Sequence, residues 1–255
     1  MQRIYRLLSI AIFSSIVLVP FATASAISTT EKPKPSVLNV QACSKLGLIT
    51  GNLNSDVNKR LEKINRERID SDTKLTGQRQ EADTKLVQTR KEADARKLEH
   101  FAKLEALAIT DEQKQAVKTF EDTVNSALVV RRTAHDTNRA TFRAGVDIAI
   151  QTRRLAIDLA VKTLKSDYQV AVVRAQATCV ADTNYKQAAD QLKIDLTTAR
   201  DKYKASKAVI PNIGDQVKAL ETARKDANKK ADDDFKATFD TALKQLMGLF
   251  GNQQV

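Results

Sequence analysis

The chain has little of what turns, sheets and aromatic binding sites are built from. Its 255 residues include no tryptophan, four tyrosines, eight phenylalanines, seven glycines and four prolines. Glycine and proline mark tight turns, and aromatic residues are enriched in strands, so their scarcity argues against a sheet-rich fold. Alanine, lysine, aspartate, glutamine, threonine and leucine dominate instead, which is typical of helices. The sequence therefore predicts an all-α chain.

Residues that commonly perform catalysis or bind metals are also scarce. The two histidines, His100 and His135, fall about 13 residues out of register in the hairpin described below, or roughly 20 Å, so they cannot share a metal ion. The run Asp232-Asp233-Asp234 lacks the glycine and the distal glutamate of a calcium loop. No glycine-rich phosphate loop and no serine-nucleophile motif occurs. We therefore expect no enzyme, no cofactor and no metal site.

The first 26 residues differ in composition from the rest. Arg3 and Arg6 precede an uncharged run over residues 7–22, and Ala24-Ser25-Ala26 supplies the small side chains of a signal-peptidase site. An uncleaved anchor is the alternative, but this run is interrupted by a proline and is shorter than the roughly 20 residues that span a bilayer. Cleavage after Ala26 predicts a secreted, periplasmic or cell-surface protein with no transmembrane span in the mature chain.

The chain stays basic when this segment is removed. It has 42 Lys and Arg against 31 Asp and Glu, or +11, and loss of Arg3 and Arg6 leaves +9 because residues 1–26 contain no acid. Cations alternate with acids along the predicted helices and aromatic stacking platforms are absent, so specific nucleic-acid binding is not expected. Diffuse attraction to anionic envelope polymers or membranes is the alternative.

Three long helices are expected in one helical coiled-coil domain, residues 53–250, at about 54–107, 111–208 and 215–247. Residues 27–52 contain prolines and glycines without helical period and predict a flexible leader. In the first helix the apolar positions advance by about 3.67 residues, which predicts a straight or weakly right-handed seam. An arginine followed four residues later by an aspartate recurs there every eleven residues, at Arg68/Asp72, Arg79/Asp83 and Arg90/Asp94.

A hairpin tip is predicted at Asp111. Thr110 and Gln113 have the spacing of a capping box at the start of a helix. In an antiparallel helix pair, facing residues lie equally far from the tip, and Cys43 and Cys179 are each 68 residues from Asp111 (111 − 43 and 179 − 111). An even number of cysteines in an exported protein favours a disulfide, so we expect one between Cys43 and Cys179.

The central helix is apolar on two sides and therefore needs two partners. One face carries Val146, Ile150, Ile157, Val161, Leu164, Val172 and Cys179. The other carries Ile148, Leu155, Leu159, Val170, Val173 and Val180, and the first five of these form the expected association face. The last helix, folding back after Pro211, is expected to pack on the central helix down to about residue 174. This leaves the second face uncovered, and we expect it to join copies of the chain or to bind another protein.

An alternative fold breaks the central helix around residues 136–145 and packs a compact four-helix bundle, which would cover that face internally. The preferred fold is an elongated antiparallel helical hairpin. It predicts a non-enzymatic exported rod that acts as a structural spacer, scaffold or protein-binding surface at the cell envelope. The alternative functions are a periplasmic holdase-like chaperone that uses the apolar segment, and a polyanion- or membrane-surface-binding protein that uses the basic residues.

Overall fold

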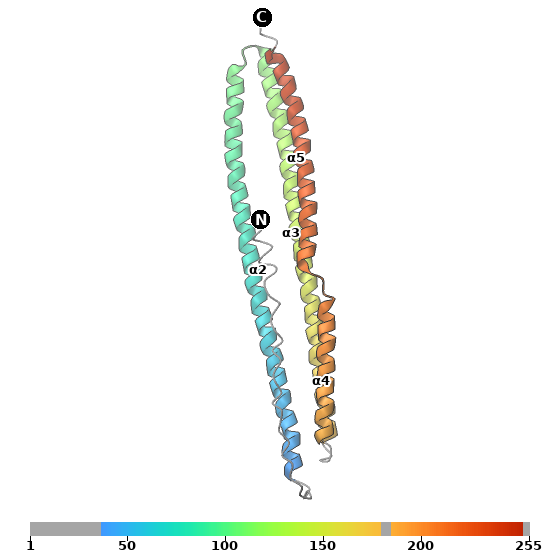
Figure 1. Cartoon of the computed structure of the whole chain (residues 1–255). Coiled ribbons are helices and arrows are strands. Elements are labelled where there is room, and N and C mark those ends of the chain that lie inside the picture. Colours follow the sequence, from blue (N-terminus) through green and yellow to red (C-terminus); the bar gives the residue numbers. More distant parts are fainter. Residues whose placement is uncertain (1–36, 180–184, 252–255) are drawn as a thin grey trace. The chain divides into compact units, whose positions relative to one another are not determined.

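The computed structural model describes residues 37–179 and 185–251, which form four α-helices (Figure 1). These are α2 (Val37–Leu107), α3 (Asp111–Cys179), α4 (Tyr185–Ala208) and α5 (Ile213–Gly251). Because the described residues contain no strand, the chain is all-α. Side chains of residues 37–47 and of Thr50 are outside the description, and so are the predicted signal peptide and its cleavage site after Ala26.

The chain divides into two compact units, which are described separately. The first consists of residues up to Arg66 together with Ile150–Gly214, and the second of Glu67–Ala149 together with the residues from Asp215 on. Helices α2 and α3 each contribute to both units, whereas α4 belongs to the first and nearly all of α5 to the second.

The start of α2 differs from the sequence prediction. The helix begins at Val37, so the prediction of a flexible leader up to residue 52 and of a helix from about residue 54 is wrong for residues 37–53. Gly47 and Gly51 had argued against a helix there, but one glycine in a helix interior costs only about 1 kcal/mol. Leucine, valine, isoleucine and alanine around them offset that cost in a helix of 71 residues.

The predicted single helix over residues 111–208 is also wrong. Helix α3 ends at Cys179 and α4 begins at Tyr185. The stretch between them includes Asp182-Thr183-Asn184, three residues with low helix propensity that favour caps and turns. The four-helix alternative had placed a break at residues 136–145, where α3 is continuous.

In the first unit, α4 lies antiparallel beside α3 (Figure 1). Arg174 donates to Asp195 at 2.9 Å, and Lys202 donates to Asp167 at 3.3 Å. Between the helices, four alanines allow a close approach of the two backbones. Leu53 and Val57 of α2 pack against the same core, whose buried members are Tyr168, Ala171, Ala175, Cys179, Ala188, Leu192, Leu196 and Ala199.

In the second unit, α5 lies antiparallel beside α3 (Figure 1). Asn138 donates to Asn228 at 3.0 Å. A Cβ added at Gly145 would come within 2.7 Å of Leu220 Cδ2, so the Leu220 side chain of α5 packs directly on α3 at this glycine. All three helices of the unit contribute to one core, in which the ring centroids of Phe101 and Phe120 are 6.1 Å apart; its buried members are Phe101, Ala108, Val117, Phe120, Val124, Ala242 and Leu246.

The position of α5 corrects a further prediction. We expected the last helix to cover the central helix from its end down to about residue 174, whereas α5 covers the part of α3 between Val117 and Gly145. The physical reason is that α4, which had been taken for the end of the central helix, already occupies α3 between Asp167 and Cys179.

Candidate binding surface

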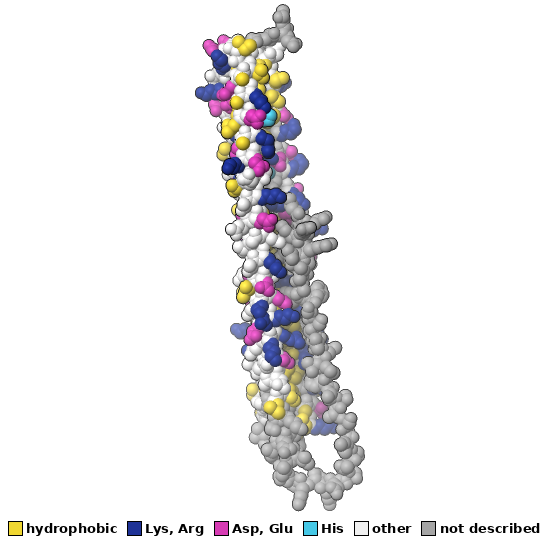
Figure 2. All heavy atoms as spheres, turned by 90° about the vertical axis from the view of Figure 1, so that its left-hand side faces the viewer, with side chains coloured by type: hydrophobic (Ala, Val, Ile, Leu, Met, Phe, Trp, Pro, Cys, Tyr) yellow, Lys and Arg dark blue, Asp and Glu magenta, His cyan; other side chains and the backbone are white. Residues whose placement is uncertain are grey.

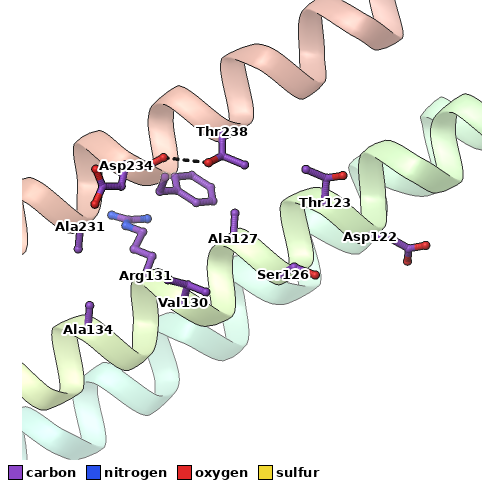
Figure 3. A pocket seen from close by; sticks show the side chains of 11 residues that line it. Asp122, Thr123, Ser126, Ala127, Val130, Arg131, Ala134, Ala231, Asp234 and Thr238 are labelled. Atoms are coloured by element: carbon purple, nitrogen blue, oxygen red, sulfur yellow. Dashed lines mark hydrogen bonds between the residues drawn. The ribbon is translucent and has the colours of Figure 1, made fainter.

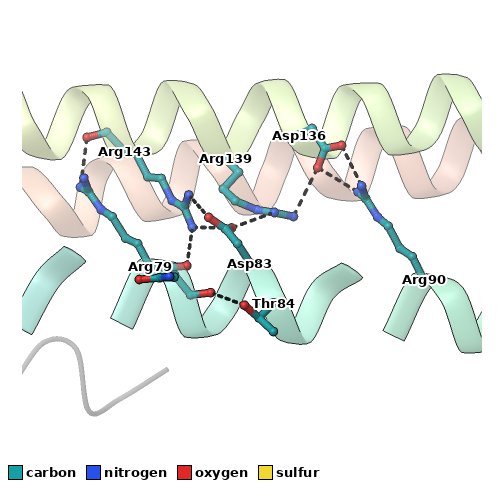
Figure 4. A network of polar contacts seen from close by, with 8 residues as sticks. Arg79, Asp83, Thr84, Arg90, Asp136, Arg139 and Arg143 are labelled. Atoms are coloured by element: carbon teal, nitrogen blue, oxygen red, sulfur yellow. Dashed lines mark hydrogen bonds and ion pairs between the residues drawn. The ribbon is translucent and has the colours of Figure 1, made fainter. Parts of the chain in front are cut away.

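Arginine and aspartate side chains make most of the polar contact between α2 and α3 in the second unit (Figure 4). Arg90 donates two hydrogen bonds of 2.8 Å to the two carboxylate oxygens of Asp136. Such bidentate pairs fix geometry as well as adding energy. We call the set the Arg–Asp ladder; its other members are the pairs Arg79–Asp147, Arg132–Asp94 and Arg143–Asp83.

The Arg–Asp ladder follows from a repeat that is present on both helices. On α2 an arginine precedes an aspartate by four residues, and this pair recurs after eleven; α3 carries the same spacing. Because the two helices are antiparallel, each arginine of the four ladder pairs lies opposite an aspartate of the other helix. Sequence reasoning noted the repeat on α2 and missed its counterpart on α3, although the same spacing was visible at Arg132/Asp136 and Arg143/Asp147.

The register of the two helices is centred within two residues of the predicted tip at Asp111. The ladder pairs are symmetrical about Gln113, since Arg90 and Asp136 are each 23 residues from it (113 − 90 and 136 − 113), whereas one further contact is symmetrical about Asp111. Lys97 donates to Asn125 at 2.6 Å, and both residues are 14 positions from Asp111 (111 − 97 and 125 − 111). At the tip, the Gln113 amide donates to the Thr110 hydroxyl at 3.2 Å, and the Gln113 side-chain oxygen accepts from the Thr110 amide at 3.2 Å. These reciprocal bonds are the contacts of a capping box. The same side-chain oxygen also accepts from the Ile109 amide at 2.8 Å.

The ladder shifts the pKa values of its own members. Hydrogen bonds from Arg143 lower the pKa of the Asp83 carboxyl, and those from Arg132 lower the pKa of Asp94. Hydrogen bonds from Arg90 lower the pKa of Asp136, and the same contact raises the pKa of Arg90. Both shifts favour the charged forms, which is the behaviour of a structural ion-pair array.

Beyond the last ladder pair, the charges on the two helices are alike. Glu121 of α3 and Glu105 of α2 stand eleven residues from Arg132 and Asp94, toward the tip. Burial, then the charges of Glu105 and Asp122, raise the pKa of Glu121. Its Oε1 atom is buried and has no hydrogen-bond partner within the described part of the chain. This step of the repeat therefore destabilises the hairpin at neutral pH.

The residues predicted to form the association face are exposed. Ile148, Leu155, Leu159, Val170 and Val173 have relative exposures of 66%, 60%, 66%, 54% and 64%. On the face predicted to be covered, Val146, Ile157, Val161 and Cys179 are 9% exposed or less. Helix α3 thus buries one of its two apolar faces and leaves the other in solvent.

Four of these exposed residues belong to the first unit, and we call them the apolar stripe: Leu155, Leu159, Val170 and Val173. At about 100° per residue they fall within roughly 60° of one another around the helix axis. Lys162 and Ser166 are exposed and lie on the same side between them. Ile148 is an exposed residue of the second unit.

A groove in the second unit runs between α3 and α5 (Figure 3). It encloses about 560 Å³. Its wall combines small apolar side chains, including Ala127, Ala134 and Ala231, with polar ones such as Ser126 and Asp234. Its arginine, Arg131, is already engaged, because it donates to Asp232 at 2.6 Å and lies 5.2 Å from the Phe235 ring centroid.

The described residues include neither a metal-binding cluster nor a membrane-spanning helix. Among them, no set of three or more His, Cys, Asp or Glu side chains could hold a metal ion. None of the described helices is long and apolar enough to cross a membrane. Charges of both signs alternate along α2 and form no large patch of one sign on the face that Figure 2 shows. His135 Nε2 lies 3.0 Å from Asp232, in contact with α5 and not with His100.

The predicted disulfide falls partly outside the described residues. Cys179 is 2% exposed in the core of the first unit, and the backbone of Cys43 is within α2, but the Cys43 side chain is not described. The bond between them stays a prediction.

Comparison with known proteins adds no assignment. The chain matches no protein-family model, no curated protein and no solved structure.

Proposed function

We propose that the chain is a non-enzymatic helical spacer or scaffold, exported to the cell envelope or beyond, that joins proteins through the apolar stripe of α3. The observation that carries this proposal is the exposure of two leucines and two valines on one side of a helix whose opposite side is buried. Large apolar side chains that gather on one exposed side of a helix mark a candidate interaction site.

The exposed area is large enough to matter energetically. Full burial of a Leu or Val side chain contributes about 1.5–3 kcal/mol. With somewhat over half of each of the four side chains exposed, covering the apolar stripe would contribute roughly 4–7 kcal/mol per chain. This is comparable with the cost of bringing two proteins together, so the stripe supports a reversible partnership.

A charge placed on the stripe tests the proposal. Leu159→Lys replaces one leucine of the apolar stripe by a second cation beside Lys162. The protein beginning at Ile27 is used so that residues 1–26 cannot occupy the surface. Light scattering and a pull-down from envelope extract should both show association with the parent chain and its loss in Leu159→Lys. Ile194→Lys is the matched control, because Ile194 is an exposed aliphatic residue of α4 in the same unit, with 58% exposure.

The result that overturns the proposal is equal behaviour of the parent, Leu159→Lys and Ile194→Lys proteins in both assays. Circular dichroism at 222 nm checks that each variant keeps its helix content, so that loss of binding is not loss of fold.

The same exposed surface favours a second candidate, a holdase-like chaperone that binds unfolded clients. A holdase slows aggregation of a denatured client at stoichiometric amounts, whereas a spacer does not. A third candidate, attachment to anionic polymers or membrane surfaces, is supported by the +9 charge expected after removal of residues 1–26. It requires release from the envelope fraction at high salt, because salt screens such contacts.

A further inference from the structure

We infer that the apolar stripe pairs with the same stripe of a second copy, running antiparallel about a twofold axis near Leu164; this rests on the proposed use of the stripe for association. Leu155 and Val173 are each nine residues from Leu164, and Leu159 and Val170 are five and six residues from it. In a twofold contact, residue i meets residue j and j meets i. Leu155 would therefore pack on the partner's Val173, and Leu159 on the partner's Val170.

The sizes of the side chains suit this pairing. The two larger residues, Leu155 and Leu159, lie on one side of the axis, and the two smaller, Val170 and Val173, lie on the other. An antiparallel contact places a larger side chain opposite a smaller one at every level, which fills the space between helices evenly. A parallel contact would place leucine on leucine at one end and valine on valine at the other.

The charges on the stripe also favour the antiparallel direction. Lys162 lies two residues before Leu164 and Ser166 two residues after it, and both are exposed. In the antiparallel pair the Lys162 ammonium group is level with the partner's Ser166, which has a hydroxyl that can accept a hydrogen bond. In a parallel pair Lys162 would be level with the partner's Lys162, and the like charges would repel.

One edge of the stripe is complementary in the same way. Asp158 lies six residues before Leu164 and Gln169 five residues after it, and both are exposed. The antiparallel pair brings the Asp158 carboxylate level with the partner's Gln169, whose amide can donate to it. The twofold axis repeats this contact, so the pair gains two of them.

The contact is small. Four aliphatic side chains per copy cover less than the roughly 800 Å² per partner of a standard interface, so the expected dimer is reversible. A covalent trap is therefore a better test than a mass measurement alone.

Single cysteines on the stripe distinguish the directions. Leu159→Cys and Val170→Cys are made in the protein beginning at Ile27, one of them with an affinity tag, and are oxidised alone and mixed. In the antiparallel pair, two copies of residue 159 are ten residues apart along the axis, or about 15 Å, beyond the reach of a disulfide. The mixture should therefore give cross-linked dimer at least several-fold above either protein alone, with the 159–170 link identified by mass spectrometry.

Leu159→Cys mixed with Ile194→Cys is the matched control and should give only background, as should the parent protein with its two native cysteines. Dimer formed equally well by each single variant alone would indicate a parallel pair and overturn the inference. Absence of dimer in every mixture would also overturn it. If no dimer formed but Leu159→Lys still abolished capture of an envelope protein, the proposed function would stand with a different partner. If Leu159→Lys had no effect on capture either, the twofold pairing and the proposed function would both be refuted.

Discussion

Exchanging the charges of one ladder pair tests whether α2 and α3 are held in register as described. Asp136→Arg removes both 2.8 Å bonds from Arg90 and the 3.4 Å contact with Arg139, and leaves three cations together. The Asp136 side chain is 47% exposed, so solvent screens the pair and its contribution stays near the upper end of the 0.2–1 kcal/mol typical of surface pairs. Adding repulsion of similar size, we expect the free energy of unfolding to fall by about 1.5–2 kcal/mol.

The second exchange should restore much of that loss. Arg90→Asp alone should also destabilise the protein, by about 1 kcal/mol, because it faces Asp136 and is near Asp94. Together with Asp136→Arg it re-forms a pair of opposite polarity. The coupling free energy of the double-mutant cycle should be about 1–2 kcal/mol, measured by urea unfolding followed by circular dichroism, and it should shrink at high salt.

A matched cycle controls for non-specific effects of charge. Arg90→Asp combined with Asp147→Arg changes the same residue types, but Asp147 pairs with Arg79 and not with Arg90. These two changes should be additive within about 0.5 kcal/mol. If Arg90 and Asp136 were equally additive, the ladder would not hold α2 against α3, and the register would be refuted.

The ladder also predicts the direction of acid destabilisation. Arginine hydrogen bonds lower the pKa values of Asp83, Asp94 and Asp136 in the folded protein. Their contribution to stability is therefore fully present above the ordinary aspartate pKa and is lost as the pH falls through the lowered folded-state values. Urea midpoints measured from pH 7 down to pH 2 should fall most steeply below about pH 4, and a variant with all three changed to asparagine should lose that part of the slope.

Three further predictions concern two glycines, Glu121 and the two cysteines. Gly77→Ala should raise the free energy of unfolding by about 0.5–1 kcal/mol, because the added Cβ would meet nothing within 4 Å apart from the adjoining residues and the backbone of its own helix. Gly145→Ala should give no gain because Leu220 must move, and urea unfolding of both variants tests the difference. For Glu121 the folded-state pKa is raised, so its stabilising contribution exists at acid pH and is lost as the pH rises through that value. Glu121→Gln should accordingly be up to about 1 kcal/mol more stable than the parent at pH 7 but not at pH 4, and an equal gain at both would contradict this assignment. Mass mapping of a non-reduced digest should find Cys43 linked to Cys179, and two free thiols would refute the disulfide.

Much of the fold could be predicted from the sequence because its signals are local. Thr110 and Gln113 mark the start of α3 by spacing alone, and the helix begins at the next residue, Asp111. The apolar periodicity of α3 likewise separates the buried face from the exposed one. What sequence reasoning missed was the end of α3, because the stretch after Cys179 contains neither glycine nor proline, and weak helix formers such as Asp182 carry a fainter signal.

Missing the end of α3 at Cys179 also caused the wrong placement of the last helix. With α4 taken as the continuation of α3, the last helix had to be placed against residues that α4 itself supplies. Only the α2 half of the Arg–Asp ladder was recognised in the sequence, for a different reason. The pairing joins residues that are far apart in the sequence, so Arg79 or Arg90 alone does not indicate which aspartate it meets. The opposing repeat on α3 would have given that answer, since Asp136 and Asp147 are separated by the same eleven residues.

Because the Arg–Asp ladder repeats every eleven residues, its charges alone do not distinguish one register of α2 against α3 from a register shifted by eleven residues. If α2 slid by eleven residues relative to α3, Arg79 would meet Asp136 and Asp83 would meet Arg132. Arg68 and Asp72 would take the former places of Arg79 and Asp83, so all four ladder pairs would be replaced by pairs of the same kind. The aromatic contact cannot be re-formed in this way, because Phe101 would leave Phe120. The charged pairs therefore permit registers that differ by eleven residues, and the contact between the aromatic rings near the tip selects one of these registers.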